Sequence, residues 1–373
     1  MPTAPQHIAQ ACQSFGEKIA SEKLPTWHAC KEIRYPQRLS LEQCSSEWTA
    51  RYKASLVNGN SLVDLTGGLG IDCSFMSQQF ASTTYVEQQE TLCELAQHNF
   101  ACLNLPILVV NDTCEHYLPS MPAVDVIFLD PARRNEQGGK VVLLQDCTPN
   151  LVEIGDLLLQ KCKNLLVKLS PMIDVESALR HFPTTQEVHI VAVNNECKEV
   201  LLRIDAEKGC SNPQIVCVNL LPKVQHQQVF SFYRQDEIDS TAQYANPMQY
   251  LYEPNAAILK AGGFKQIAQQ LGIYKLHPSS HLYTSDACID DFPGRVFAIE
   301  RITKVQRKEI ADIDKANLSI RNFPGSVADL RKKLKLKDGG DTYIFATTLH
   351  DNSKVLVVGR KLGVRSYDIP KAF

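Results

Sequence analysis

The chain has 373 residues, 44% of them hydrophobic and 21% charged, as is typical of a globular protein with two or three domains. It has no apolar run of about 18 residues, so no membrane span is expected, and its first residues lack the basic and apolar regions expected of a signal peptide. Its thirteen cysteines form no C-x-x-C pair, which favours reduced thiols in a cytoplasmic protein over disulfides or a metal site. Residues 301–373 contain 16 Lys and Arg but only 8 Asp and Glu, whereas residues 1–300 contain 23 Lys and Arg and 33 Asp and Glu. This basic C-terminal region predicts a polyanionic partner.

The first 55 residues predict a helical segment. Residues 8–19 have an amphipathic pattern, and residues 41–56 favour a second helix. Ser40 stands where a helix cap is expected, with Gln43 three residues later in the capping-box position.

From residue 61 the pattern alternates between strands and helices, which is typical of a parallel sheet covered on both faces. The expected strands are near 61–65, 82–87, 106–111, 124–129 and 164–169, and the expected helices are near 71–80, 88–103 and 149–161. Residues 189–204 then form two β-rich runs around an Asn194-Asn195 turn, which predicts a hairpin. A parallel sheet that ends in an antiparallel hairpin is the order expected of class I methyltransferases rather than dehydrogenases. We therefore predict an α/β, Rossmann-like domain with a seven-stranded sheet over residues 56–212.

The rest of the chain predicts small α+β domains. Residues 211–260 look irregular and favour a connection, and a helix is expected near 255–271. Near the end we expect a strand at 316–321, a basic helix at 326–336 and two strands at 342–348 and 354–361. Such a module is of the kind that lays a sheet or a helix on RNA.

The run Ser61-Leu-Val-Asp-Leu-Thr-Gly-Gly-Leu-Gly70 leads from an apolar strand into a glycine-rich turn. Glycines let a backbone turn sharply and approach a ligand, and ligands of open α/β sheets bind where strands end. Acidic residues close three strands in turn, and this ladder predicts S-adenosylmethionine (SAM). Asp64 would face the methionine amino group, Glu87 the ribose hydroxyls and Asp112 the adenine amino group. The expected cofactor-binding residues are Asp64, Thr66, Gly67, Gly68, Gly70, Glu87 and Asp112.

A dinucleotide is the alternative cofactor. The run Gly68-Leu-Gly-Ile-Asp-Cys73 resembles G-x-G-x-x-G with cysteine in place of the third glycine. In that motif a helix N-terminus receives a pyrophosphate. Asp72 at the start of the expected helix would repel a pyrophosphate, whereas SAM carries no phosphate, so the sequence favours SAM.

The fourth strand ends in Asp130-Pro-Ala-Arg-Arg134. Methyltransferases that act on nitrogen carry Asp/Asn-Pro-Pro-aromatic at this place, where the acid and a backbone carbonyl hold the target amine and the aromatic ring stacks on the base. Asp130 and Pro131 keep the first half and are the expected catalytic residues. Ala132 and Arg133 replace the second half, and Arg133 could stack on a base, pair with a phosphate or form a structural ion pair.

Uracil C5 methylation is the competing chemistry, and it needs a cysteine nucleophile. The loop after the fifth strand, Lys168-Leu-Ser-Pro-Met-Ile173, contains no cysteine. Cys147 lies in the loop after Asp130, and we expect it to be a buried thiol and not a nucleophile. The basic helix carries the expected RNA contacts, because its cations would face solvent while Leu330, Leu334 and Leu336 pack inward. The expected RNA-binding residues are Arg133, Arg331, Lys332, Lys333, Lys335 and Lys337, with Arg321, Arg360, Lys361 and Arg365 as further candidates.

Several runs together resemble bacterial SAM-dependent methyltransferases with a THUMP-like C-terminal domain. They are residues 41–53, 64–70, 129–134, 252–260, 291–296 and 331–343. The resemblance implies a catalytic domain related to RNA guanine-N2 (cap-type) methyltransferases, a connecting region at 213–274, a ferredoxin-like domain at 275–315 and a THUMP-like domain at 316–373. It also implies that Gln43, Ser45 and Thr49 could touch the cofactor.

The predicted function is thus SAM-dependent methylation of a base nitrogen in tRNA or rRNA. Two other functions fit the same residues. One is RNA binding without catalysis, which the Ala132-Arg133 departure allows, and the other is methylation of a small molecule or a protein.

Overall fold

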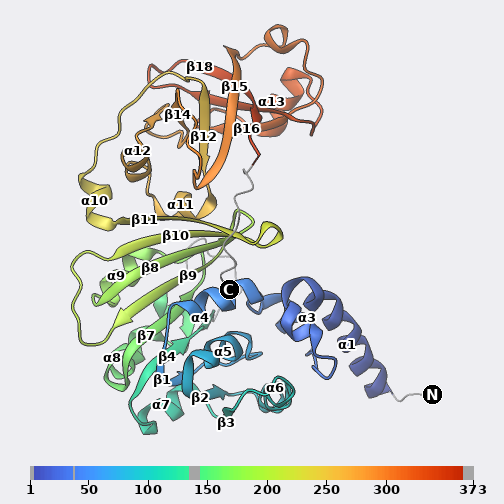
Figure 1. Cartoon of the computed structure of the whole chain (residues 1–373), viewed down its shortest axis with the longest axis vertical. Coiled ribbons are helices and arrows are strands. Elements are labelled where there is room, and N and C mark those ends of the chain that lie inside the picture. Colours follow the sequence, from blue (N-terminus) through green and yellow to red (C-terminus); the bar gives the residue numbers. More distant parts are fainter. Residues whose placement is uncertain (1–3, 37, 134–142, 364–373) are drawn as a thin grey trace. The chain divides into compact units, whose positions relative to one another are not determined.

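The computed structural model describes residues 4–36, 38–133 and 143–363, which divide into two units (Figure 1). The first unit holds the chain up to residue 191 together with 198–213, and the second holds 192–197 and the chain from 214 onward. Within these described ranges no helix is both long enough and apolar enough to cross a membrane.

The N-terminal segment is helical, as the sequence predicts, but its second predicted helix is interrupted. The helices are α1 (Ala4–Lys23), α2 (Pro25–Ala29), α3 (Arg38–Gln43) and α4 (Glu47–Ser55). The N-cap of α4 is Ser46, whereas Ser40 lies within α3. The Ser46 backbone is extended, and Ser46 Oγ accepts from the Thr49 N–H at 3.3 Å. Because a cap residue leaves the helical conformation, the predicted helix breaks into α3 and α4.

The first unit is built on a mixed sheet. Its strands are β1 (Gly59–Asp64), β2 (Phe80–Glu87), β3 (Ile107–Asn111), β4 (Val124–Leu129), β7 (Cys162–Leu169), β8 (Thr185–Val193) and β9 (Glu196–Asp205). They run in the order β8-β9-β7-β4-β1-β2-β3. The pairs among β1, β2, β3, β4 and β7 are parallel, whereas β9 is antiparallel to β7. The predicted α/β class and its antiparallel final hairpin are confirmed.

Helices cover this sheet because its central strands are apolar on both faces. The helices after β1 are α5 (Ile71–Met76), α6 (Glu90–Cys102), α7 (Cys114–Ser120), α8 (Leu151–Lys161) and α9 (Val175–His181). In β7, Leu165, Leu166 and Val167 are all fully buried. Helix α6 packs on β2 and β3, α8 packs on β7, and α4 packs on α5 (Figure 1).

The segment expected to be irregular, residues 211–260, is largely ordered into elements. Strands β10 (Gln214–Leu221) and β11 (His226–Tyr233) form an antiparallel hairpin, and α10 (Arg234–Asp239) follows. This hairpin belongs to the second unit. The helix predicted at 255–271 is two helices, α11 (Ala256–Ala261) and α12 (Gln266–Leu271), because Gly262 takes a positive φ of 77° that ends the first.

The second unit also contains a seven-stranded sheet. In spatial order its strands are β13 (Tyr274–Lys275), β14 (Tyr283–Ser285), β12 (Tyr250–Pro254), β15 (Gly294–Lys304), β18 (Lys354–Lys361), β17 (Thr342–Thr348) and β16 (Asn317–Arg321). The basic helix is α13 (Val327–Leu334), which packs on β16. Leu330, Leu334 and Leu336 are buried in one apolar cluster, as the sequence predicts.

Candidate functional site

The glycine turn lies where β1 ends, and it admits no side chain at two positions. A Cβ on Gly67 would stand 2.1 Å from Cε2 of Tyr85, and Gly70 has a φ of +75° that L side chains rarely adopt. Gly70 also begins α5, so the turn delivers the chain directly into a helix. Packing against aromatic rings and the backbone conformation therefore restrict these two positions to glycine.

Asp64 closes β1 and is 1% exposed. Its Oδ1 accepts from the Thr66 N–H at 3.0 Å. Burial raises the pKa of Asp64 well above its usual range, and the neighbouring carboxylates of Asp72 and Asp130 raise it further against the opposing bond from Thr66. A buried carboxyl of this kind gains most from a cationic partner such as an ammonium group.

Glu87 closes β2 and holds the glycine turn. One carboxylate oxygen accepts from the Gly68 N–H and the other from the Gln89 N–H, each at 2.9 Å. Tyr85, two residues earlier, donates its hydroxyl to the Gly68 carbonyl at 2.5 Å. Each carboxylate oxygen can accept more than one hydrogen bond, so Glu87 keeps acceptor capacity for a diol.

Asp112 follows β3 and lies beside Glu87, whose carbonyl accepts from the Asp112 N–H at 3.1 Å. His116 lies 2.8 Å from the Asp112 carboxylate, and this hydrogen bond holds the pKa of Asp112 below its usual range. The ends of β1, β2 and β3 therefore bring the three predicted acids to one edge of the sheet, as their order in the sequence predicts.

Asp130 follows β4 and reaches the same turn, because its N–H donates to Thr66 Oγ1 at 2.6 Å. Its carboxylate forms a close ion pair with Lys168 of β7, with side-chain exposed fractions of 38% and 14%. Pro131 is buried after it. Ala132 and Arg133 form the short strand β5, which pairs with β6 (Cys147–Thr148). Arg134 lies outside the described residues, and so do Arg133's side-chain contacts.

Lys168 is a charged group that the sequence reasoning missed. Burial acts to lower its pKa, but the carboxylates of Asp130, Asp72 and Glu199 outweigh burial and raise the pKa above its usual value. The sequence signal that could have identified Lys168 is a single lysine near the end of a predicted strand that is otherwise apolar.

A second buried ion pair stands behind the first, and it was also missed. Lys53 of α4 is fully buried, and its Nζ lies 2.8 and 2.7 Å from the two carboxylate oxygens of Glu199 on β9. Asp72 Oδ1 lies 3.2 Å from the same ammonium group, and Asp72 Oδ2 accepts from Ser45 Oγ at 2.7 Å. Nothing in the sequence pairs residues 53 and 199, because they lie on a helix and a strand 146 residues apart.

This contact changes the role given to Asp72. Lys53 and Ser45 compensate the Asp72 carboxylate, so it is not a free charge at the start of α5. Asp72 therefore does not count against a dinucleotide, contrary to the prediction from the sequence. The evidence against a dinucleotide is instead the strand order, in which β9 inserts antiparallel between β7 and β8.

Two of the three residues that the resemblance places near the cofactor have partners within the protein. Ser45 Oγ donates to Asp72, and the Thr49 N–H donates to Oγ of Ser46, the N-cap of α4. Gln43 is exposed at the end of α3.

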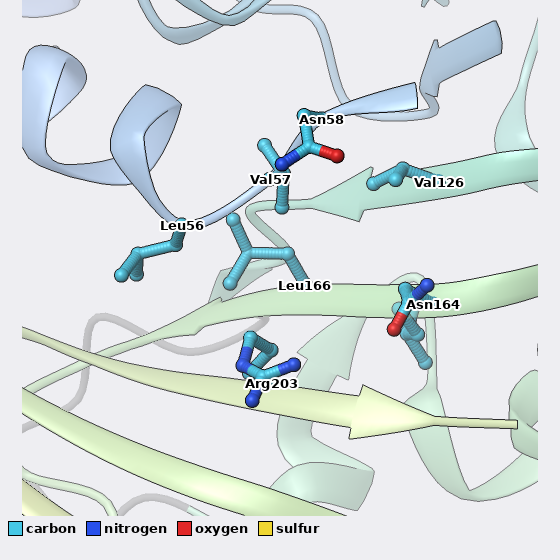
Figure 2. Close-up of a pocket in the computed structure, with 8 residues that line it drawn as sticks. Leu56, Val57, Asn58, Val126, Asn164, Leu166 and Arg203 are labelled. Atoms are coloured by element: carbon cyan, nitrogen blue, oxygen red, sulfur yellow. The ribbon is translucent and has the colours of Figure 1, made fainter. Parts of the chain in front are cut away.

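A pocket of about 140 Å³ in the first unit lies away from this edge (Figure 2). Figure 2 shows Asn58 on the loop before β1, Asn164 on β7 and Arg203 on β9. None of the predicted site residues lines it. Its cation is already paired, because Arg203 Nε donates to Glu187 at 2.7 Å.

The predicted RNA-binding residues of the basic helix lie in the second unit. Four lysines are exposed: Lys332, Lys333, Lys335 and Lys337. Arg331 pairs with Asp338 at 2.7 Å and Arg321 with the buried Glu253 at 2.6 Å, while Arg360 pairs with Glu300 at 2.6 Å. Arg365 lies outside the described residues. The lysines are thus the cations of this helix most available to a polyanion.

No group of three or more His, Cys, Asp or Glu side chains in the described ranges is arranged to hold a metal ion. Cys147 is 3% exposed, as the interpretation of a buried thiol predicts. All thirteen cysteines are free thiols.

Comparison with known proteins gives two family matches and one near relative. A ferredoxin-like domain model matches residues 250–293, and a THUMP domain-like model matches residues 294–361. Both ranges begin earlier than the predicted 275–315 and 316–373. Strands β12 and β15 pair across the boundary between the matched ranges, so both belong to one sheet.

The near relative is a solved structure described as a "putative methyltransferase" from Porphyromonas gingivalis W83. It is 36% identical, covers 95% of this chain and 90% of that chain, and superposes with a TM-score of 0.87. Distant likenesses include an rRNA methylase from Streptococcus thermophilus (12% identity, 42% and 93% coverage, TM-score 0.31). Another is TrmK from M. capricolum bound to S-adenosylhomocysteine (13%, 43% and 69%, 0.35). Among curated proteins, none matches.

Proposed function

The chain belongs to the methyltransferase family of the Porphyromonas gingivalis protein, with ferredoxin-like and THUMP-like domains, and we propose that it transfers the methyl group of SAM to RNA. The observation that carries this proposal is that Asp64, Glu87 and Asp112 lie at the ends of neighbouring parallel strands, at one edge of the sheet, where Glu87 binds the glycine turn. Each acid closes a strand of a sheet whose order is that of class I methyltransferases.

The residues present fit SAM. Asp64 is a buried carboxyl with a raised pKa, so it suits the cationic amino group of the methionine moiety. Glu87 keeps acceptor capacity for the two ribose hydroxyls, and Asp112 offers an acceptor to the adenine amino group. A Cβ on Gly68 would meet no atom closer than 3.9 Å, so the turn leaves room for close approach at that position. SAM supplies a methyl group on a positively charged sulfur, which leaves as a neutral thioether.

RNA is the proposed substrate for two reasons. Residues 294–361 match the THUMP domain-like model, and the exposed lysines of α13 and the residues after it supply cations for phosphates. Phosphate contacts of this kind give affinity with little sequence information, so the RNA species stays open. A cytoplasmic location stays a prediction.

Two features bear on the acceptor atom. Asp130-Pro131 favours a base nitrogen of the guanine-N2 type, because a carboxylate at the end of this strand can hold an amine in line with the methyl group. The close ion pair between Asp130 and Lys168 is a feature that the nitrogen motif does not require.

The substitution Asp130→Ala tests the proposal. We expect methyl transfer to total RNA from cells lacking this protein to fall at least 100-fold, because positioning of the acceptor is lost. Binding of SAM, measured by calorimetry, should change little. Asp125→Ala is the matched control, since Asp125 lies on the same strand and pairs with the exposed Lys163.

Other outcomes identify the other functions. RNA binding by a wild-type chain that transfers no methyl group to any RNA would point to a non-catalytic RNA-binding protein. Label that appears in protein or small molecules and not in RNA would point to the other substrate classes. Full activity of the Asp130→Ala variant would refute the catalytic role of Asp130.

A further inference from the structure

The ion pair at the end of β4 occupies the group that a nitrogen acceptor needs. Lys168 donates from Nζ to Asp130 Oδ2 in a close contact, and the ammonium group is mostly shielded from solvent. An amine acceptor would itself donate to the Asp130 carboxylate. One carboxylate oxygen of Asp130 already holds an ammonium group, so an amine acceptor would have to share this carboxylate with Lys168.

The Lys168–Asp130 pair is continued by the buried pair behind it. Lys53 binds both oxygens of Glu199 and lies 3.2 Å from Asp72. The carboxylates of Glu199 and Asp72 act on Lys168 as well. Acids and lysines therefore alternate along a series that ends at the predicted catalytic residue Asp130. In order the series is Asp72 on α5, Lys53 on α4, Glu199 on β9, Lys168 on β7 and Asp130 after β4.

The base-stacking half of the nitrogen motif is also missing. Ala132 stands where the second proline is expected and Arg133 where the aromatic residue is expected. An exocyclic amine of a base is neutral and needs mainly positioning, and it gains nothing from a lysine surrounded by carboxylates. A hydroxyl group, by contrast, must lose its proton as it is methylated, and a positioned lysine can accept that proton when its amine is in the neutral form.

We propose that the acceptor is a hydroxyl group of RNA, the ribose 2′-hydroxyl, with Lys168 as its general base and Asp130 holding Lys168 in place. This proposal rests on the proposed function, since it takes RNA and SAM as given. It replaces the base nitrogen with an oxygen that every nucleotide of RNA presents and DNA lacks. Lys53 and Glu199 are positioning residues, because they act on the acceptor only through Lys168.

Methyl transfer to the hydroxyl forms one bond, breaks one bond and moves one proton. The hydroxyl oxygen forms a bond to the methyl carbon while the carbon–sulfur bond breaks and its electron pair stays on sulfur. The hydroxyl proton passes to the neutral amine of Lys168, and Asp130 stabilises the resulting ammonium group. Solvent takes this proton before the next turnover.

This chemistry sets the sign of the pH dependence. The carboxylates of Asp130, Asp72 and Glu199 act on Lys168 and together raise its pKa. The thiol of Cys44, in the segment before α4, also interacts with Lys168. Below that pKa the fraction of neutral amine grows about tenfold per pH unit, so the transfer rate should climb steadily through the alkaline range. A base amine is already neutral there and would give a flat profile.

The decisive experiment identifies the methylated atom. The full chain is incubated with methyl-labelled SAM and total RNA from cells lacking this protein, and the RNA is hydrolysed with alkali and also digested to nucleosides for mass spectrometry. A 2′-O-methyl group blocks alkaline cleavage, so label should remain in alkali-stable dinucleotides and should reside on the ribose. Label in single nucleotides with the methyl group on a base nitrogen would overturn the hydroxyl inference and leave the proposed function standing.

Variants separate a general base from a structural ion pair. Lys168→Arg keeps the pair with Asp130 but cannot give up its proton near neutral pH, so we expect a loss of about 100-fold to 10,000-fold in kcat with SAM binding and Tm retained. Lys168→Gln should lose activity similarly, and Lys163→Gln, which breaks a Lys–Asp pair between the same two strands at an exposed site, should not. Wild-type kcat in Lys168→Arg would overturn the general-base role. Failure of the wild-type chain to label any RNA would contradict the proposed function itself.

Discussion

Removal of the buried ammonium group of Lys53 should destabilise the first unit strongly. Lys53 is fully buried, and Lys53→Met keeps the aliphatic stem while it leaves the carboxylates of Glu199 and Asp72 without their cation. Breaking a buried pair by removing one partner costs about 3–5 kcal/mol. Asp72 keeps its bond from Ser45, so most of this cost falls on Glu199, which is 2% exposed.

Tryptophan fluorescence reports this unit selectively, because both tryptophans of the chain, Trp27 and Trp48, belong to it. We expect urea unfolding followed by fluorescence to show a lower midpoint for Lys53→Met. The double variant Lys53→Met/Glu199→Gln should recover about 1–3 kcal/mol, because the unpaired buried charge is gone.

The pH dependence has a definite sign. Burial raises the pKa of Glu199, and the ammonium group of Lys53 opposes this rise. In Lys53→Met the folded-state pKa is therefore further above the unfolded value, and the loss of stability should grow with rising pH and shrink as the pH falls toward about 4. A loss below about 1 kcal/mol at pH 7, or no recovery in the double variant, would refute this account of the pair.

Three further substitutions have expected outcomes. Asp64→Asn removes a buried carboxyl whose pKa is raised, and the cost of that carboxyl to folding grows as the pH rises. The Tm of the ligand-free variant should therefore be higher than that of the wild type at pH 8. The affinity for SAM, measured by calorimetry, should fall about 10-fold or more. Gly70→Ala places a Cβ 2.5 Å from the Phe100 ring of α6, at a positive φ, and should lower both the Tm and the affinity for SAM. The control is Gly209→Ala, where a Cβ meets no atom within 4 Å and neither quantity should change. Replacing the exposed Lys332 and Lys333 with glutamate should weaken RNA binding in filter assays and flatten its salt dependence, with Tm unchanged.

The sequence predicts the cofactor edge well because its signals are local. Asp64, Glu87 and Asp112 each end a strand, and parallel strands bring their ends to one edge of a sheet by geometry alone. Strands β17 and β18 were likewise predicted at their observed bounds, since alternation of apolar residues between clear turns needs no tertiary information.

The charged interior could not be predicted in this way. Lys53 lies in the same helix as the exposed Arg51, and Glu199 follows the exposed Lys198 in its strand, so the local sequence predicts a surface position for each. Their burial follows only from the pairing of α4 with β9 in three dimensions. The same limit applies to β11, whose polar start, His226-Gln-Gln228, carries a weak strand pattern and whose register is set by pairing with β10. Strand β10 is apolar, and its pattern was missed.

The bonds from Gly68 to Glu87 and Tyr85 have a consequence for the kinetics of SAM binding. They hold the glycine turn in shape from within the protein, so little backbone ordering remains to be done when a ligand arrives. Association measured by stopped flow should then be a single fast phase whose rate rises linearly with ligand concentration, with no slow step at saturation. Selectivity between SAM and its demethylated product would consequently reside in dissociation rates, because both would meet the same rigid loop on the way in.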